Sequence, residues 1–138
     1  RANWEGAYIG GLNFEKARLT QVNFKHVTNR SNDKHMAVKF QDVHLYGANL
    51  EGAHLYGANF QGAHLVNANL QGSSLSFANL TGANLSGAAL EDVTLPNDER
   101  WTPNEDMDRF TNPEHPDYLT TLEKINKIQE ELLNDIPF

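Results

Sequence analysis

Three histidines spaced ten residues apart are the side chains in this sequence best suited to chemistry. They are His44, His54 and His64. Neutral imidazoles bind transition-metal ions, and imidazoles that titrate near neutral pH can act as pH-sensitive groups. Whether these three act together depends on the elements that position them, because a metal site needs its ligands on one surface.

Other arrangements that carry catalysis are missing from the sequence. It contains no cysteine, and we find no paired carboxylates, no Ser-His-Asp arrangement and no phosphate-binding glycine loop. Without cysteine there is no disulfide framework, no iron–sulfur site and no cysteine nucleophile. We therefore expect a protein that is not an enzyme and that has no cofactor.

A five-residue repeat organises most of the chain. From residue 40 to residue 95 every fifth residue is Leu or Phe, and two places earlier stands a small residue, usually Ala. This spacing matches neither the helix period nor the strand period. If the large residue (the centre of each unit) and the small residue both point inward, each unit makes one short extended segment and one turn. Four units then close a coil of twenty residues, and a column of apolar side chains fills its interior.

The glycines support this coil. Nine of the ten glycines stand two places after a centre. A type II turn requires a positive φ there, which glycine adopts without strain. After Gly11 this place is taken by Lys16, Gln21 and His26, for which we expect either a turn of another type or a strained turn. Neighbouring coils should stack about 4.8 Å apart.

The coil separates the histidines. Ten residues are half a coil, so His54 lies on the side opposite His44, whereas His44 and His64 stack on one side about 5 Å apart. Two ligands are fewer than a zinc site usually takes, and the next residue in that column is Asn84. We therefore expect two solvated histidines and no metal site. Below about pH 6 the two rings should repel each other.

The unit Ala-Asn-Leu/Phe-X-Gly resembles the pentapeptide-repeat family. It occurs at residues 48–52, 58–62, 68–72 and 83–87, and the resemblance covers about residues 2–97 with one interruption. The resemblance implies an all-β solenoid, a right-handed quadrilateral β-helix of about four coils. Residues 94–111 also look like the segment that follows the repeats in many cyanobacterial members.

One interruption breaks the register. The centres on either side of it are sixteen residues apart, which is not a multiple of five. Continuing either phase would place Asn29, or Arg30 and His35, inward, where a polar group without a partner is costly. We therefore expect an inserted loop over about residues 27–37. The loop is either a tolerated surface insertion or a recognition loop on a rigid scaffold.

The predicted partner-binding site is this loop with its basic surroundings. Residues 16–39 carry six basic side chains and one acidic side chain, Asp33. The site residues predicted from the sequence are Lys25, Arg30, Lys34, His35 and Lys39. The same segment could bind phosphates, but it lacks interleaved aromatic residues apart from Phe24, a predicted core residue. We therefore do not expect direct nucleic-acid binding.

The chain divides into a repeat domain, residues 1–97, and a C-terminal α-helical tail, residues 98–138. Residues 96–138 hold four basic and eleven acidic side chains, which account for the entire net charge of −7. Thr102 and Pro103 suit the start of a short helix over about residues 103–110. Apolar residues at helical spacing predict an amphipathic helix over about residues 118–134. The tail either caps the open end of the solenoid or serves as a dimerisation or partner helix.

These features favour a rigid protein–protein interaction module with an unknown protein partner. We expect a monomer or a weak dimer formed through an end or the C-terminal helix. The family resemblance implies one alternative, a DNA mimic that modulates type II topoisomerases. Such a mimic needs acidic faces, whereas Glu51 is the only formal charge in residues 44–90. Ice binding would need stacked Thr rows, and Thr81 and Thr94 do not stack at a spacing of twenty.

The sequence also limits the compartment. No apolar run is long enough to span a membrane, and no signal peptide is visible in the chain as given. We expect a cytoplasmic protein, with the thylakoid lumen or the periplasm as the alternative if an N-terminal signal has been removed.

Overall fold

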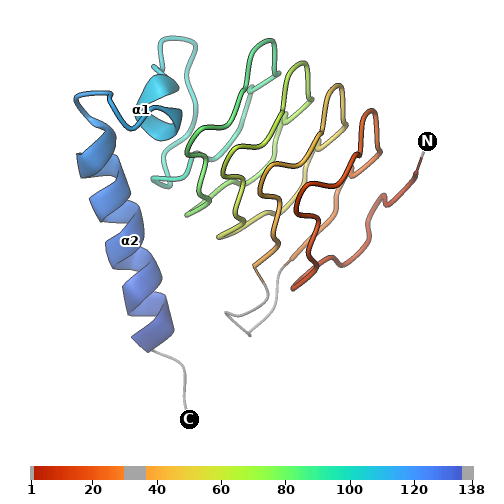
Figure 1. Cartoon of the computed structure of the whole chain (residues 1–138), viewed down its shortest axis with the longest axis horizontal. Helices are drawn as coiled ribbons and strands as arrows, with labels where there is room; N and C mark the ends of the chain where they lie inside the picture. The colour runs from red at the N-terminus through yellow and green to blue at the C-terminus, as the bar shows by residue number, and fades with distance from the viewer. Residues whose placement is uncertain (1, 30–36, 135–138) are drawn as a thin grey trace.

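The chain winds into a stack of coils whose axis runs from the N-terminus toward two C-terminal helices (Figure 1). The computed structural model describes residues 2–29 and 37–134. Parallel β-bridges join neighbouring coils, and the partners stand twenty residues apart, as in Asn49↔Asn69 and Asn59↔Asn79. The bridges recur every five residues, so each coil has four short sides. The solenoid expected from the repeat is confirmed.

Each side of a coil is hydrogen-bonded to the coils before and after it. The Asn49 N–H donates to the Val22 carbonyl at 3.0 Å, and the Leu50 N–H donates to the Asn69 carbonyl at 2.7 Å. Within the turn, the Ala53 N–H donates to the Leu50 carbonyl at 3.1 Å. The backbone groups of each repeat are thus paired with the neighbouring coils and within the turn, as burial requires. Each side of a coil contributes only a single bridge.

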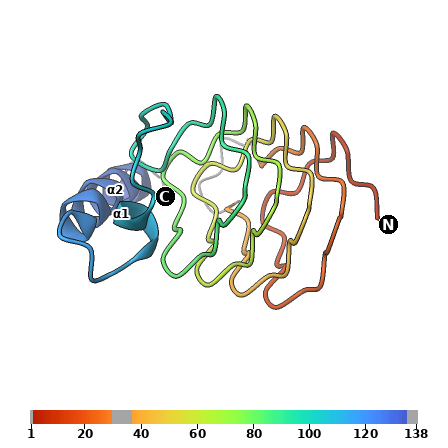
Figure 2. The ribbon, with the colours of Figure 1, turned by 90° about the horizontal axis from the view of Figure 1, so that it is seen from above.

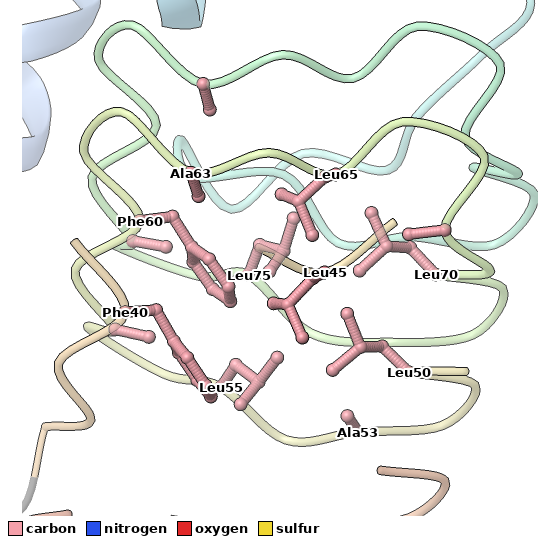
Figure 3. Packing of buried hydrophobic residues seen from close by; sticks show 14 of the residues in the cluster. Phe40, Leu45, Leu50, Ala53, Leu55, Phe60, Ala63, Leu65, Leu70 and Leu75 are labelled. Carbon is pink, nitrogen blue, oxygen red and sulfur yellow. The ribbon is translucent and has the colours of Figure 1, made fainter. Parts of the chain in front are cut away.

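The core is a column of the large and small residues of the repeat. Leu45, Leu50, Leu55 and Phe60 point toward one another inside the coils (Figure 3) and have no exposed surface. The small residues are buried beside them, and Ala53 is one example. The predicted inward positions of the repeat are therefore confirmed.

Aromatic rings extend this core toward the N-terminal end. Phe40 stacks on Phe60 with ring centroids 4.8 Å apart, and Phe14 stacks on Phe40 at 5.2 Å. Trp4 packs edge-on against Phe14 at 5.6 Å and tilted against Phe24 at 5.9 Å. The half-buried Trp4 therefore lies at the end of the aromatic column.

The turns use one backbone conformation whether or not they contain glycine. Lys16, Gln21 and His26 have φ of 58°, 57° and 56°, close to the 61° of Gly47. Of the two alternatives predicted for these turns, another turn type was wrong and a strained turn is confirmed, because all three residues adopt the glycine conformation. Hydrogen bonds between coils, such as that from the Lys16 N–H to the Gln41 carbonyl at 2.9 Å, hold them there. A left-handed conformation costs a non-glycine residue free energy.

Asparagine side chains brace many of these turns. In each, the side-chain oxygen accepts a hydrogen bond from the backbone N–H two residues later, as from Asn49 to Glu51 at 3.0 Å. The bond recurs at Asn3, Asn13, Asn23, Asn59, Asn69, Asn79, Asn84 and Asn97. A bond that links two coils joins Asn23 Nδ2 to Asn3 Oδ1 at 2.9 Å. The recurring asparagines therefore act mainly within their own turns.

The interruption is shorter than expected. Bridge partners across it, such as Asn13↔Lys39 and Arg18↔His44, stand twenty-six residues apart, so it adds six residues to a coil that otherwise continues unchanged. Val27 is buried in the core, and Thr28 forms a bridge with His54. The expected start of the loop at residue 27 was therefore wrong, because the coil continues at least to residue 29. Residues 30–36 lie outside the described part of the chain.

The coil continues past the expected start of the loop because Asn29 occupies an inward centre, where it is only 5% exposed. Its Nδ2 donates to the carbonyl of Tyr56 at 2.7 Å. This hydrogen bond offsets part of the cost of burying the amide, whose Oδ1 is buried without a partner among the described residues. The sequence analysis had excluded that position because no partner was visible.

Two helices cover the C-terminal end of the stack (Figure 2). Helix α1 spans Asp108–Thr111 and helix α2 spans Tyr118–Asn134. The predicted range of the longer helix agrees with α2. The predicted short helix over residues 103–110 was wrong at its start, because residues 103–104 form a turn, residues 105–106 have no regular structure and α1 begins only at Asp108.

Contacts to the last coils favour the capping role of the tail. The Gly82 N–H donates to the Thr111 carbonyl at 2.7 Å, and the Tyr118 hydroxyl lies 2.7 Å from Thr81 Oγ1. Phe110 is buried against the solenoid core, and Ile125 of α2 is also buried. These contacts pair backbone and bury apolar surface that would otherwise form an open end.

Candidate partner-binding surfaces

The basic residues predicted as a partner site are not brought together. Lys25 Nζ lies 3.7 Å from Glu51 Oε1, so Lys25 is engaged in an ion pair on its own face. Lys39 is exposed and lies in a bridge column with Asn13 and Asn59, half a coil away from the Lys25 side. The other three predicted residues, Arg30, Lys34 and His35, lie outside the described residues. The described members of the predicted site therefore face opposite directions.

A corner of the solenoid beside the insert carries two packed aromatic rings, the exposed Tyr56 and the half-buried Phe77. Tyr56 and Phe77 contact edge-to-face with ring centroids 5.0 Å apart, and Tyr56 is 39% exposed. Asn29, the last described residue before the insert, donates its hydrogen bond to the backbone of this same Tyr56. We call Asn29, Tyr56 and Phe77 the insert corner. The sequence analysis missed it because the two rings come from neighbouring coils at different positions of the repeat.

Phe77 holds an unusual backbone conformation in this corner. Its φ is +60°, in the left-handed region that its neighbour Gly57 occupies one coil earlier with φ +66°. Among the described non-glycine residues with positive φ it is the only apolar one. Bulky side chains rarely adopt this conformation, and such strain concentrates at functional sites.

The electrostatics of the corner keep the phenol of Tyr56 neutral. Partial burial raises the pKa of Tyr56 above its ordinary value of 10.0, and the nearby carboxylate of Asp98 raises it further. Asp98 is held in place by the Ser76 hydroxyl, which donates to Asp98 Oδ1 at 2.8 Å. The corner therefore offers two aromatic rings and one neutral hydroxyl to a partner.

A second surface contains the stacked histidines. His44 and His64 form a parallel bridge with ring centroids 4.7 Å apart, so their predicted stacking is confirmed. His54 pairs instead with Thr28 and Ser74, so its predicted separation from the other two is also confirmed. We call His44, His64 and Tyr46 the histidine face.

Two contacts of His44 and His64 were not predicted from the sequence. The hydroxyl of Tyr46 lies 3.3 Å from His64 Nδ1, and the two rings stack at 5.7 Å. Arg18 forms a bridge with His44. This pairing became visible only once the length of the insert was known. Over residues 2–29 and 37–134, no cluster of three or more His, Cys, Asp or Glu residues is placed to hold a metal ion.

The fold and these surfaces define the class of protein. It is a β-solenoid with four-sided coils of twenty residues, which presents rows of side chains on a stack of paired turns. No helix in the described part of the chain is long and apolar enough to cross a membrane.

Sequence comparison identifies the repeat. Residues 36–72 and 58–95 match the family model of pentapeptide repeats, in eight copies. No curated protein sequence matches the chain. The match covers residues 36–95, which include the repeat centres from Phe40 to Leu95.

Solved structures of similar fold include pentapeptide repeat proteins. Rfr23 of the cyanobacterium Cyanothece 51142 is 25% identical, with a TM-score of 0.44, over 73% of this chain and 88% of that one. A protein from the thylakoid lumen of Arabidopsis thaliana is 23% identical, with a TM-score of 0.35, over 86% of this chain and 90% of that one.

QnrB1, a plasmid-mediated fluoroquinolone resistance protein, is 19% identical to the chain, with a TM-score of 0.37. The similarity covers 67% of this chain and 56% of QnrB1. All three TM-scores are below 0.5, so we draw no argument about function from these similarities.

Proposed function

We propose that the protein is a non-catalytic, rigid protein–protein interaction module whose insert corner binds a protein partner. In this proposal the coils form a right-handed quadrilateral β-helix of about four turns that serves as the scaffold. The observation that carries the proposal is the coincidence of three features at one corner: the six-residue insertion, the packing of the exposed Tyr56 on the half-buried Phe77, and the strained backbone of Phe77.

The insertion is consistent with a binding loop on a rigid scaffold. The described bridges on both sides of it keep their register, so the coil resumes unchanged after the extra residues. Recognition residues commonly lie on loops that a rigid framework positions. In sequence the insert carries Arg30, Lys34 and His35, which we retain as proposed contacts. Lys39 follows the insert, whereas Lys25 already pairs with Glu51.

The aromatic pair fits the composition of protein interfaces. Aromatic residues are enriched in the centres of such interfaces and often dominate their energetics. The local cost of a left-handed Phe is easier to explain if Phe77 has a role that a glycine could not perform. A glycine at this position would relieve the strain but would remove the ring that packs on Tyr56.

The test compares three baits in a lysate of the source organism. They are the intact chain, a chain in which residues 30–37 are replaced by a Ser-Gly turn, and the Phe77→Gly variant. The replacement shortens the chain by six residues and so restores the regular twenty-residue spacing. We expect a protein that the intact chain captures and both variants lose, while both variants stay folded by circular dichroism.

A matched control is Gln61→Ala, an exposed position elsewhere on the coil, which should retain the partner. A partner that all baits retain would contradict the proposed site. If that partner were a type II topoisomerase, the DNA-mimic alternative would replace our proposal. The observation against that alternative is the neutral solenoid, in which residues 44–90 contain Glu51 as their single formal charge.

A further inference from the structure

We propose that His44 and His64 form a two-imidazole binding site for a divalent transition-metal ion. The two side chains are half-buried and project from neighbouring coils on one face. Imidazole nitrogen suits Zn²⁺, Ni²⁺ and Cu²⁺, and Cu²⁺ binds most tightly in the general order of these ions. The site lies half a coil from the insert corner, so it is independent of the proposed partner surface.

The ring separation fits simultaneous coordination. A metal–imidazole bond of about 2.0–2.1 Å places the ion about 3.2 Å from the centre of each ring. Two such ligands at an angle of about 90–110° then have ring centroids about 4.5–5.2 Å apart. The observed separation of 4.7 Å lies within that range. The planes are tilted by 35°, so the rings are not locked in a parallel stack.

Tyr46 supplies the supporting contact that a metal-binding histidine usually has. Its hydroxyl oxygen lies 3.3 Å from His64 Nδ1. When Nδ1 carries the proton and donates it to this oxygen, the lone pair of Nε2 remains free for an ion. A hydrogen bond of this kind fixes the tautomer and the ring orientation of a metal ligand. From the sequence alone we expected two solvated histidines, because two ligands are fewer than a zinc site usually takes and the contact with Tyr46 was not visible.

The charges and ligands around the two histidines determine the expected affinity for the metal ion. Along the same column Arg18 precedes His44 and Asn84 follows His64, so one positive charge stands near the site and no carboxylate lies in the column. Arg18 therefore opposes the bound cation. Because the protein supplies only two ligands, water must complete the coordination sphere.

The experiment titrates Cu²⁺ into the full chain by isothermal titration calorimetry at neutral pH. We expect one tight site, and we expect His44→Asn and His64→Asn each to weaken it by at least tenfold, because either change removes the chelate. Asn is a suitable replacement because this column already carries Asn84. Arg18→Gln should tighten binding several-fold, and Tyr46→Phe should weaken it several-fold.

His54→Asn is the matched control, because His54 occupies the same position of the repeat on the opposite side and has no histidine bridge partner. Its Cu²⁺ affinity should equal that of the unaltered chain. Equal losses in His54→Asn and His44→Asn would overturn the proposal and indicate adventitious binding to separate imidazoles. Unchanged affinity in both His44→Asn and His64→Asn would also overturn it.

Discussion

Phe60→Ala tests the packing on which the whole scaffold depends. Phe60 has no exposed surface, and its ring stacks on Phe40 at 4.8 Å with an interplanar angle of 11°. The substitution removes a buried ring from the middle of a column in which each side chain contacts those of the neighbouring coils. The backbone around the cavity cannot collapse freely because hydrogen bonds hold the coils above and below.

The magnitude follows from comparable core truncations. Replacing a buried Phe by Ala typically destabilises a protein by about 3–5 kcal/mol. A stacked aromatic pair contributes about 0.5–1.5 kcal/mol beyond simple burial, which places the expected loss in the upper part of that range. Gln61→Ala, one residue away but exposed, should change stability by less than about 0.5 kcal/mol.

The assay is urea denaturation of the three proteins followed by circular dichroism, with a second spectroscopic probe to check for a two-state transition. We expect Phe60→Ala to lower the transition midpoint while the slope stays unchanged. A loss below about 1 kcal/mol, or an equal loss in Gln61→Ala, would refute the inward assignment of the repeat centres.

Three further predictions concern the turns and the titrating groups. Lys16→Gly should stabilise the protein by about 0.5–1 kcal/mol in the same assay, because relief of the left-handed strain exceeds the cost of the extra conformational entropy that glycine gives the unfolded chain. A hydrogen bond from His115 lowers the pKa of Asp106 below its ordinary value of 3.8. The contribution of Asp106 to the free energy of unfolding is therefore present above that value and is lost as the pH falls through the folded-state pKa. Lowering the pH should therefore reduce the difference in the free energy of unfolding between the unaltered protein and Asp106→Asn. A difference that stays constant with pH would contradict this account. Burial, aided by Asp98, raises the pKa of Tyr56 above 10.0. The contribution of Tyr56 to the free energy of unfolding is therefore present below that value and is lost as the pH rises through the folded-state pKa. The phenolate absorbance of the unaltered protein, compared with that of Tyr56→Phe, should show this late ionisation.

The regular part of the fold could be predicted because periodicity carries the information. A strict five-residue repeat fixes which residues point inward, and the amphipathic spacing in residues 118–134 indicates one helix face. Both signals are local and repeated, so no long-range contact is needed to read them. The stacking of His44 and His64 followed from the same arithmetic.

The register across the insert could not be predicted, because it depends on one tertiary hydrogen bond. Asn29 is acceptable inside the coil only because the carbonyl of Tyr56 reaches it. Without that contact the sequence favours removing Asn29 from the core, and the positions of Arg18 and Lys25 relative to the later coils are then misassigned. The start of the short helix was also misplaced: despite the local capping signals at Thr102, residues 103–104 form only a turn and the helix begins at Asp108.

The insert corner was equally hidden from sequence reasoning. Tyr56 and Phe77 are twenty-one residues apart and occupy different positions of the repeat, so periodicity does not pair them. The only sequence signal was the bulky Phe77 at a place where most units carry glycine. That signal becomes informative once the structure shows that Phe77 adopts the same left-handed conformation as those glycines.

The most direct test of the proposed function is site-specific photo-crosslinking at two matched tyrosines. Tyr56 lies at the insert corner and Tyr46 lies on the opposite side of the coil, and their exposures are similar at 39% and 37%. A photoreactive phenylalanine analogue would be placed at one position or the other in the full chain, and each protein would be irradiated in a lysate of the source organism. Our account predicts a covalent adduct with one protein from position 56 and none from position 46. An adduct from position 46 alone, or equal adducts from both positions, would contradict it.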